Sequence, residues 1–329
     1  MIKIAFFDTK EYDRKLFDEY NRNYDYDITY FKTTLNAETA PLSKGFDVVC
    51  IFVHDIVGEQ TLRILEENGV KLVALRCAGF NNVDLEHKGN IKIVRVPQYS
   101  PYAVAEHAVA LLLNITRKLY KSYQRTRKYN FTLDGLLGFD IHGKTVGVIG
   151  TGKIGKVFIQ IMKGFGTNVI AYDLFKDEVA SREIGFEYVS LDELYAKSDI
   201  ISLHCPLTPE TENIINAQSI KKMKDGVVLI NCSRGKLIDT NSLIKEMETG
   251  KIGGIGLDVY EDEEKFFLRD MTNSYKRDKN LSILLSMPNS IITSHQAFFT
   301  KEALNTIASD TFQNIKEVFD GIECKNELR

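Results

Sequence analysis

A short apolar run that leads into three closely spaced glycines constrains this chain more than any other feature. Residues 146–149 are apolar or glycine, Gly150, Gly152 and Gly155 follow, and a helix-favouring segment comes next. In a strand-to-helix turn, Gly150 permits the tight bend, Gly152 lets a phosphate approach the backbone, and Gly155 lets helix and strand pack closely. The helix N-terminus then offers N–H groups to an anion. The turn therefore predicts a phosphate-binding site.

A carboxylate downstream favours a dinucleotide over the ligand-free turns that glycine-rich sequences can also form. A second apolar segment, residues 168–172, ends directly before Asp173. Asp173 follows the first glycine by roughly 20 residues, the spacing at which an acidic side chain accepts hydrogen bonds from an adenosine ribose. Its charge would repel the 2′-phosphate of NADP, so we expect NAD to be the cofactor.

Length, charge and cysteine usage exclude several classes of protein. The 329 residues suffice for two domains, and a net charge of −3 implies no general attraction to nucleic acid or to a membrane surface. No uncharged apolar run approaches the ~18 residues of a membrane span, and the apolar start is too short for a signal peptide. The five cysteines are scattered and form no C-x-x-C pair. We therefore expect a cytoplasmic protein with no disulfide frame and no metal site.

Strand-like and helix-like segments alternate through both halves of the chain, which predicts an α/β protein with two doubly wound parallel sheets. A break at residues 97–101 separates the halves, and Ser100-Pro101 is expected to start a long helix. One face of that helix, as far as Leu119, is expected to be buried, and the basic residues 117–128 are expected to form a solvated face. The predicted strands are 2–7, 47–53, 71–75, 145–149, 168–172, 200–203, 227–230, 255–259 and 290–293, and the other predicted helices are 11–20, 60–67, 153–165, 220–223, 241–248 and one from Thr300.

Three ionisable residues follow apolar strands in or beside the predicted nucleotide domain: Arg234, Glu263 and His295. Ligands of such sheets bind outside the carboxyl ends of the strands. Reduction of a 2-keto acid needs a guanidinium that grips the carboxylate, a proton donor that titrates near neutrality, and a carboxylate that favours the protonated donor. Each residue alone more often serves an ion pair or a solvated loop. Their joint placement favours a catalytic set.

These motifs, taken in order, resemble the D-isomer-specific 2-hydroxyacid dehydrogenases, and the resemblance runs nearly end to end. Within that family the chain looks most like the fermentative D-lactate dehydrogenases, on the evidence of residues 76–84, 97–101 and 295–298. The motifs that carry the family resemblance are Gly150–Gly155, Asp173, Leu203–Pro206, Asn231–Gly235, Asp258–Glu261 and Ser294–Phe298.

The resemblance implies a role for each site residue. Arg234 would bind the substrate carboxylate and polarise the keto oxygen, His295 would pass the proton, and Glu263 would partner His295. The backbone at Ala78 and Gly79 would cradle the carboxylate, and Tyr99 and Phe298 would line the side-chain pocket. The implied cofactor-binding residues are Gly150, Gly152, Lys153, Ile154, Gly155, Asp173, Cys205, Pro206, Thr211, Cys232, Ser233 and Asp258.

The resemblance also implies an architecture and a reaction. A Rossmann-type NAD domain, residues 101–298, would be inserted into a flavodoxin-like substrate domain made of residues 1–100 and 299–329, in a homodimer or homotetramer. The implied reaction is reduction of pyruvate to D-lactate by NADH. Two alternatives remain open: a reductase of larger 2-keto acids, and an NAD-sensing, corepressor-like binding protein.

Overall fold

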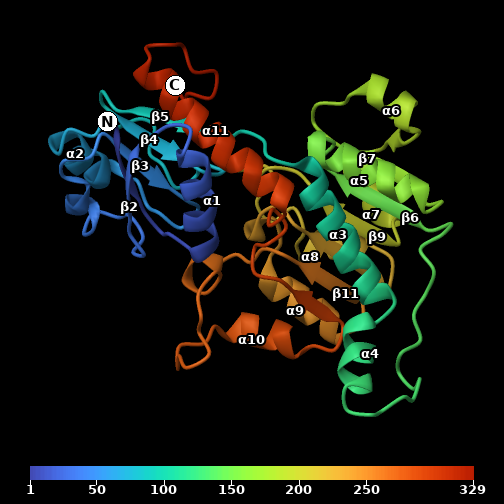
Figure 1. Ribbon diagram of the computed structural model, residues 1–329. Helices are drawn as coiled ribbons and strands as arrows, with labels where there is room; N and C mark the ends of the chain where they lie inside the picture. Colours follow the sequence, from blue (N-terminus) through green and yellow to red (C-terminus); the bar gives the residue numbers. More distant parts are fainter. The chain divides into compact units, whose positions relative to one another are not determined.

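The computed structural model describes residues 1–329 and divides into two compact units, residues 1–100 with 299–329 and residues 101–298. Figure 1 shows one sheet in each unit. All strand pairs of both sheets are parallel. None of the helices combines the length and the apolar character that crossing a bilayer would require.

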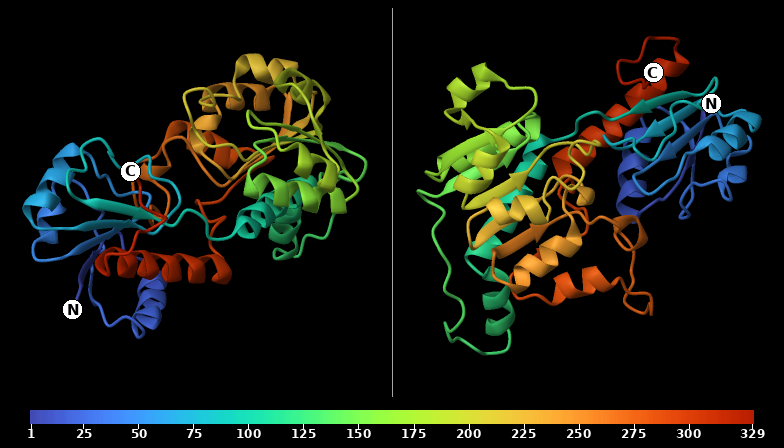
Figure 2. Two further views of the ribbon diagram at one scale, coloured as in Figure 1. Left: turned by 90° about the horizontal axis from the view of Figure 1, so that it is seen from above. Right: turned by 180° about the vertical axis from the view of Figure 1, so that it is seen from behind.

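The first unit contains a five-stranded sheet with helices on both faces. Helices α1 (Glu11–Asn21) and α11 (Lys301–Phe319) pack together on one face, and α2 (Glu59–Glu67) lies on the other (Figure 2, left). A 3-10 turn, η1 (Ala40–Ser43), packs against α2. The strand order is the flavodoxin-like one. It reads β2 (Asp27–Tyr30), β1 (Lys3–Phe6), β3 (Val48–Ile51), β4 (Leu72–Leu75) and β5 (Lys92–Arg95).

The second unit contains a seven-stranded sheet whose order is that of a dinucleotide-binding domain with one added strand. The two halves of the sheet extend outward from β6 and β9, which creates a topological switch point between them. The order reads β12 (Ser290–Ile292), β11 (Ile252–Leu257), β10 (Val227–Asn231), β9 (Ile200–Leu203), β6 (Thr145–Ile149), β7 (Asn168–Tyr172) and β8 (Glu187–Tyr188).

Apolar side chains fill a core on each face of this second sheet. Helices α3 (Pro101–Thr116) and α5 (Lys153–Gly164) bury one face, where Leu112 and Phe158 are fully enclosed. Helices α7 (Leu191–Lys197), α8 (Ala217–Lys222), α9 (Thr240–Glu248) and α10 (Lys279–Ser286) bury the other. Because both faces are covered, the central strands of the sheet are nearly continuous apolar runs, which is why they were readable from the sequence.

The predicted fold class, two parallel α/β sheets, is confirmed, and the differences concern local elements. The long helix begins at Pro101 as expected but ends at Thr116, because Lys118 takes a left-handed φ of 52°. A separate helix, α4 (Leu119–Thr126), follows. The expectation that Leu119 is buried is therefore wrong, since it is 55% exposed. The helix predicted at 220–223 is α8, which starts three residues earlier, at Ala217.

Several short elements were missed because their sequences carry little apolar signal. In β2, exposed residues alternate with half-buried ones, and β5 begins and ends on a charged residue. Strand β8 is only two residues long. Helices α6 (Glu178–Ile184) and α7 have seven residues each, and the side chains of Asp177 and Ser190 cap their N-termini. The polar stretch 261–280 contains a 3-10 turn, η3 (Glu263–Lys265), and the start of α10.

Candidate active site

The carboxyl ends of the strands in the second sheet lie level with one another. The register pairs Ile149 with Tyr172 and Leu203, and Asn231 with Leu203 and Leu257. Leu257 in turn pairs with Ile292 of β12. Most of the predicted functional residues lie one to three residues after one of these strand ends, so parallel pairing brings them to a single edge of the sheet, whereas Thr211 and Glu263 lie farther along the loops that follow β9 and β11.

The turn between β6 and α5 uses its three glycines for different reasons. Gly150 has a φ of +97°, and a Cβ there would lie 2.5 Å from the backbone nitrogen of Cys205. A Cβ on Gly155 would lie 2.1 Å from the carbonyl oxygen of Gly150. A Cβ on Gly152, in contrast, would meet nothing within 4 Å. Packing thus explains the first and third glycines, whereas the second borders open space at the N-terminus of α5, where a pyrophosphate fits.

Asp173 follows β7 and is held beside the glycine turn. Its Oδ2 atom accepts the backbone N–H of Thr151 at 2.6 Å and the Thr151 hydroxyl at 3.0 Å, and its Oδ1 atom accepts the N–H of Phe175 at 2.9 Å. The carboxylate remains partly exposed. The turn and the carboxylate therefore form one local unit, as a dinucleotide fingerprint requires.

Arg234 follows β10 on a loop that the side chain of Asn231 holds in place. The Asn231 side chain receives the N–H of Ser233 at 2.9 Å and donates to the carbonyl of Arg234 at 2.8 Å. The next residue, Gly235, lies so close to Tyr260 that a Cβ would be 2.0 Å from its carbonyl carbon. The Arg234 guanidinium donates once, to the carbonyl of Ser233, and forms no ion pair. It is thus a half-buried cation available to an anionic ligand.

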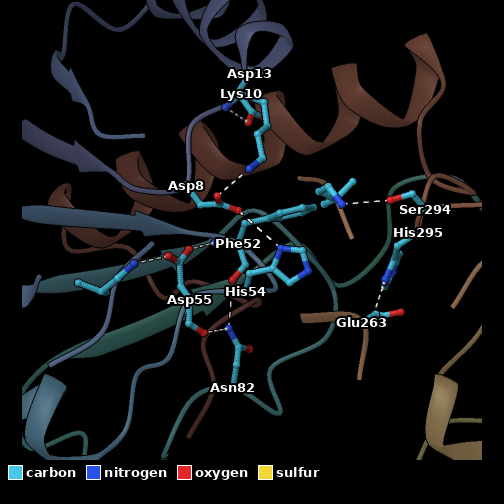
Figure 3. Close-up of polar contacts among 12 residues, drawn as sticks. Asp8, Lys10, Asp13, Phe52, His54, Asp55, Asn82, Glu263, Ser294 and His295 are labelled. Atoms are coloured by element: carbon cyan, nitrogen blue, oxygen red, sulfur yellow. Dashed lines mark hydrogen bonds and ion pairs between the residues drawn. The ribbon is translucent and has the colours of Figure 1, made fainter. Parts of the chain in front are cut away.

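His295 and Glu263 form a hydrogen-bonded pair (Figure 3). The Nδ1 atom of the imidazole lies 2.7 Å from Oε1 of Glu263, and both side chains are largely buried. The second carboxylate oxygen accepts the backbone N–H of Tyr260 at 3.0 Å. The His295 backbone has a left-handed φ of 46°, and its N–H donates to the carbonyl of Asp258. A residue other than glycine in this conformation is strained, and such strain is concentrated at functional sites.

Asp258 organises the loop that carries His295. Its carboxylate accepts the Thr293 hydroxyl at 2.5 Å and the N–H groups of Gln296 and Ala297 at 2.9 and 2.8 Å. Burial opposes the charge, but the hydrogen bonds from His107, Thr293 and the two N–H groups lower the pKa of Asp258 below its ordinary value. The sequence prediction that Asp258 contacts the cofactor stays a prediction, and the contacts observed here hold the histidine loop.

Two residues of this arrangement were missed from the sequence. His107 lies on α3, and its Nε2 atom is 3.0 Å from the Thr293 hydroxyl and 3.4 Å from the carboxylate of Asp258. Nothing near His107 in the sequence indicates that contact, because a helix on the face of the sheet supplies it. Thr293 follows directly after β12, so its position at a strand end was a signal that could have been used.

The remaining predicted cofactor residues line the same edge. Cys205 follows β9, and its carbonyl accepts the Ser233 hydroxyl at 2.6 Å, which joins the ends of β9 and β10. Thr211 closes the loop after Pro206 by donating to its carbonyl at 2.7 Å. Burial raises the pKa of Cys205 to about 11, and burial followed by the charge of Asp258 raises that of Cys232 well above the ordinary value. Neither thiol ionises near neutral pH. Lys153 and Ile154 form the first turn of α5.

His204 is a buried structural residue. It lies between the strand end and Cys205, and its Nε2 atom is 2.8 Å from the Ser202 hydroxyl. Its ring packs on Phe158, and burial lowers the pKa of His204 to about 3. A histidine that stays neutral at physiological pH is a poor general acid.

Three of the predicted substrate-binding residues lie in the first unit. Ala78 and Gly79 follow β4, and Tyr99 follows β5, each of them half-buried. Phe298 ends the second unit and is 6% exposed.

Several buried polar residues that the sequence did not indicate lie near the carboxyl ends of strands in the first sheet (Figure 3). Asp8 follows β1 and pairs with Lys10, and Asp55 follows β3 and accepts the N–H groups of Leu35 and Phe52, both at 2.5 Å. Burial raises the pKa of Asp55 to about 6.

Comparison with known proteins identifies the family of this chain. The sequence profile of the D-isomer specific 2-hydroxyacid dehydrogenase NAD binding domain matches residues 109–297. A 2-hydroxyacid dehydrogenase homolog of Haemophilus influenzae is 50% identical, over 99% of this chain and 98% of its own. The D-lactate dehydrogenase of Escherichia coli is 45% identical, over 99% of this chain and 100% of its own. A structure of the pyruvate reductase of Chlamydomonas reinhardtii superposes with a TM-score of 0.93 at 43% identity, covering 99% of this chain and 98% of that one.

Proposed function

The chain belongs to the D-isomer-specific 2-hydroxyacid dehydrogenases and carries their NAD-binding domain, and from that membership we propose that it reduces pyruvate to D-lactate with NADH. The observation that carries the proposal is the His295–Glu263 pair, which lies on the same sheet edge as the unpaired guanidinium of Arg234. The relatives named D-lactate dehydrogenase and pyruvate reductase support the choice of substrate.

Bound NADH supplies a hydride to the keto carbon, and the residues of the chain provide the rest of the chemistry. Arg234 grips the carboxylate and polarises the keto oxygen, because its planar fork matches two oxygens at once. The backbone N–H groups at Ala78 and Gly79 also take the carboxylate. His295 gives its proton from Nε2 to the developing alkoxide, while Glu263 stabilises the imidazolium and fixes the ring.

The proposed cofactor contacts follow the edge of the second sheet. The first turn of α5, with Gly152, Lys153 and Ile154, takes the pyrophosphate, and Asp173 accepts from the adenosine ribose. The backbone at Cys205, Pro206, Thr211, Cys232 and Ser233 would contact the cofactor beside the switch point, and Asp258 would lie near its nicotinamide.

Tyr99 and Phe298 are proposed to contact the substrate side chain. Aromatic side chains exclude water and suit a small apolar substituent such as a methyl group, which favours pyruvate over branched or aromatic 2-keto acids. A reductase of larger 2-keto acids is the second candidate, since pocket size alone separates the two.

The test is a comparison of kcat/KM for pyruvate, 2-ketoisocaproate, phenylpyruvate and hydroxypyruvate with NADH, together with the chirality of the product. Pyruvate is expected to be the best substrate and D-lactate its product. A higher kcat/KM for 2-ketoisocaproate or phenylpyruvate would move the assignment to the larger acids. Absence of NADH oxidation with all four acids would favour a corepressor-like binding protein instead.

We further propose a cytoplasmic location and assembly as a homodimer or homotetramer. The five cysteines are all unbridged, as expected in a reducing compartment. Light scattering after size exclusion measures the assembly directly, and a monomeric mass at micromolar concentration would reject it.

A further inference from the structure

Arg95 ends strand β5, and its side chain reaches the loop that follows the neighbouring strand β4. The register pairs Arg95 with Leu75, so the two strands end at the same level. The Nη1 atom of Arg95 donates to the carbonyl oxygen of Ala78 at 2.8 Å, and the guanidinium lies 4.9 Å from the centre of the Phe80 ring. Arg95 forms no ion pair with a carboxylate, so its positive charge lies against this loop.

These contacts set the direction of the N–H groups in the loop. A trans peptide is planar, and its C=O and N–H point in opposite directions. Arg95 holds the oxygen of the peptide between Ala78 and Gly79, and the thiol of Cys77 donates to the oxygen of the next peptide at 3.3 Å. The N–H groups of Gly79 and Phe80 therefore point to the other side of the loop. Neither donates to an atom of the protein.

The backbone of Arg95 is itself fixed. Its N–H donates to the carbonyl of Asn326 at 3.1 Å, and its carbonyl accepts the side chain of Asn314, on α11, at 2.9 Å. Arg95 therefore contacts the C-terminal segment through its backbone and the loop at Ala78 through its side chain. A cation on a carbonyl oxygen also polarises the peptide, which strengthens the N–H of the same peptide as a donor.

We propose that Arg95 is a positioning residue for the substrate carboxylate: it directs and polarises the Gly79 N–H without touching the substrate. The inference rests on the proposed 2-keto acid reduction and on the proposed carboxylate contact at Ala78 and Gly79. It explains why an unpaired arginine stacks on Phe80 at this point, where a neutral residue could fill the same space.

Arg95→Met tests the proposal, because methionine keeps an apolar stem while removing the hydrogen bond and the charge. We expect KM for pyruvate and the inhibition constant of oxamate, an isosteric analogue, each to rise about tenfold or more, since a charge-assisted hydrogen bond is lost. We expect kcat at saturating pyruvate to change much less and NADH affinity not to change. Arg95→Lys should recover part of the loss. Lys92→Met is the matched control, an exposed cation on the same strand with no side-chain partner, and it should leave all constants unchanged.

Unchanged KM and oxamate inhibition in an active Arg95→Met enzyme would overturn the proposal. So would a lower kcat with normal KM, which is the signature of a smaller folded fraction. If Arg95→Met does not fold, Phe80→Leu removes the ring under the guanidinium and should raise KM in the same direction, and a normal KM there would overturn the proposal equally. A wild-type enzyme that reduces no 2-keto acid and binds no oxamate would instead reject the proposed function, and this inference with it.

Discussion

Nδ1 of His295 lies 2.7 Å from Oε1 of Glu263, and the other oxygen of that carboxylate is held by the backbone N–H of Tyr260. The carboxylate is thus fixed at both oxygens, and the imidazole presents its Nε2 atom on the opposite side. In the proposed reaction this arrangement decides which ring nitrogen gives the proton. It also makes Glu263 act on the substrate only through His295.

That dependence predicts non-additive losses in a double-mutant cycle. His295→Gln should lower kcat by ~10²–10⁴-fold, the usual contribution of general acid catalysis. Glu263→Gln should lower kcat less, because a neutral amide still orients the ring but no longer stabilises the imidazolium. The double variant should be no slower than His295→Gln alone. Steady-state kcat and the fluorescence titration of NADH measure this, and losses that multiply would show that Glu263 acts independently.

Arg234→Lys should lower kcat/KM for pyruvate by about 10²-fold or more, because an ammonium cannot reproduce the two-pronged contact of a guanidinium. The loss should fall on pyruvate and oxamate and leave NADH binding unchanged. Lys236→Met serves as the control, because Lys236 is an exposed cation on the same loop. Equal kcat/KM in Arg234→Lys and wild type would rule out the clamp.

Asp173→Asn should relax the preference for NADH. The carboxylate lies beside the glycine turn through its contacts with Thr151, where a 2′-phosphate would meet its charge. We expect the ratio of kcat/KM for NADPH to that for NADH to rise about tenfold or more, which corresponds to roughly 1.4 kcal/mol. Glu178→Gln, the loss of a nearby exposed acid, should leave the ratio unchanged. A wild-type enzyme that uses both cofactors equally would contradict the prediction at the outset.

Asp258→Asn should destabilise the second unit in a pH-dependent way. The folded protein lowers the pKa of Asp258, so the unfolded state binds its proton more readily as the pH falls. The stabilisation that the ionised carboxylate of Asp258 provides is therefore present above the ordinary pKa of 3.8, and it is lost as the pH falls through the lowered pKa of the folded protein. An amide would also set an NH₂ group against an N–H of Gln296 or Ala297. We expect a loss of about 2–3 kcal/mol near pH 7.

Urea denaturation of wild type and Asp258→Asn from pH 7 downward measures that difference. The gap in unfolding free energy should be constant above about pH 5 and should narrow on further acidification. A gap that is the same at every pH would mean that the charge of Asp258 contributes nothing.

The glycine turn and Asp173 were readable from the sequence because each depends on neighbours close in the chain. Packing explains Gly150 and Gly155, and open space borders Gly152, which matches the separate roles that the order of the three glycines predicts. The buried strands were equally readable, since both faces of a parallel sheet are apolar. The break after α3 at Lys118 was not, because a single left-handed residue ends a helix whose apolar pattern continues to Leu119.

The sequence by itself determined the fold class, the place for a dinucleotide and the residue types of the proposed catalytic set, because apolar periodicity and glycine spacing are local properties. The tertiary structure shows the contact between Glu263 and His295 that the family resemblance implied. Only the tertiary structure decided that Asp258 and His107 support the histidine loop and that Arg95 reaches the loop at Ala78. These contacts join residues on different strands and helices. Parallel strand register and helix packing bring them within hydrogen-bonding distance, and neither is encoded in any single stretch of the chain.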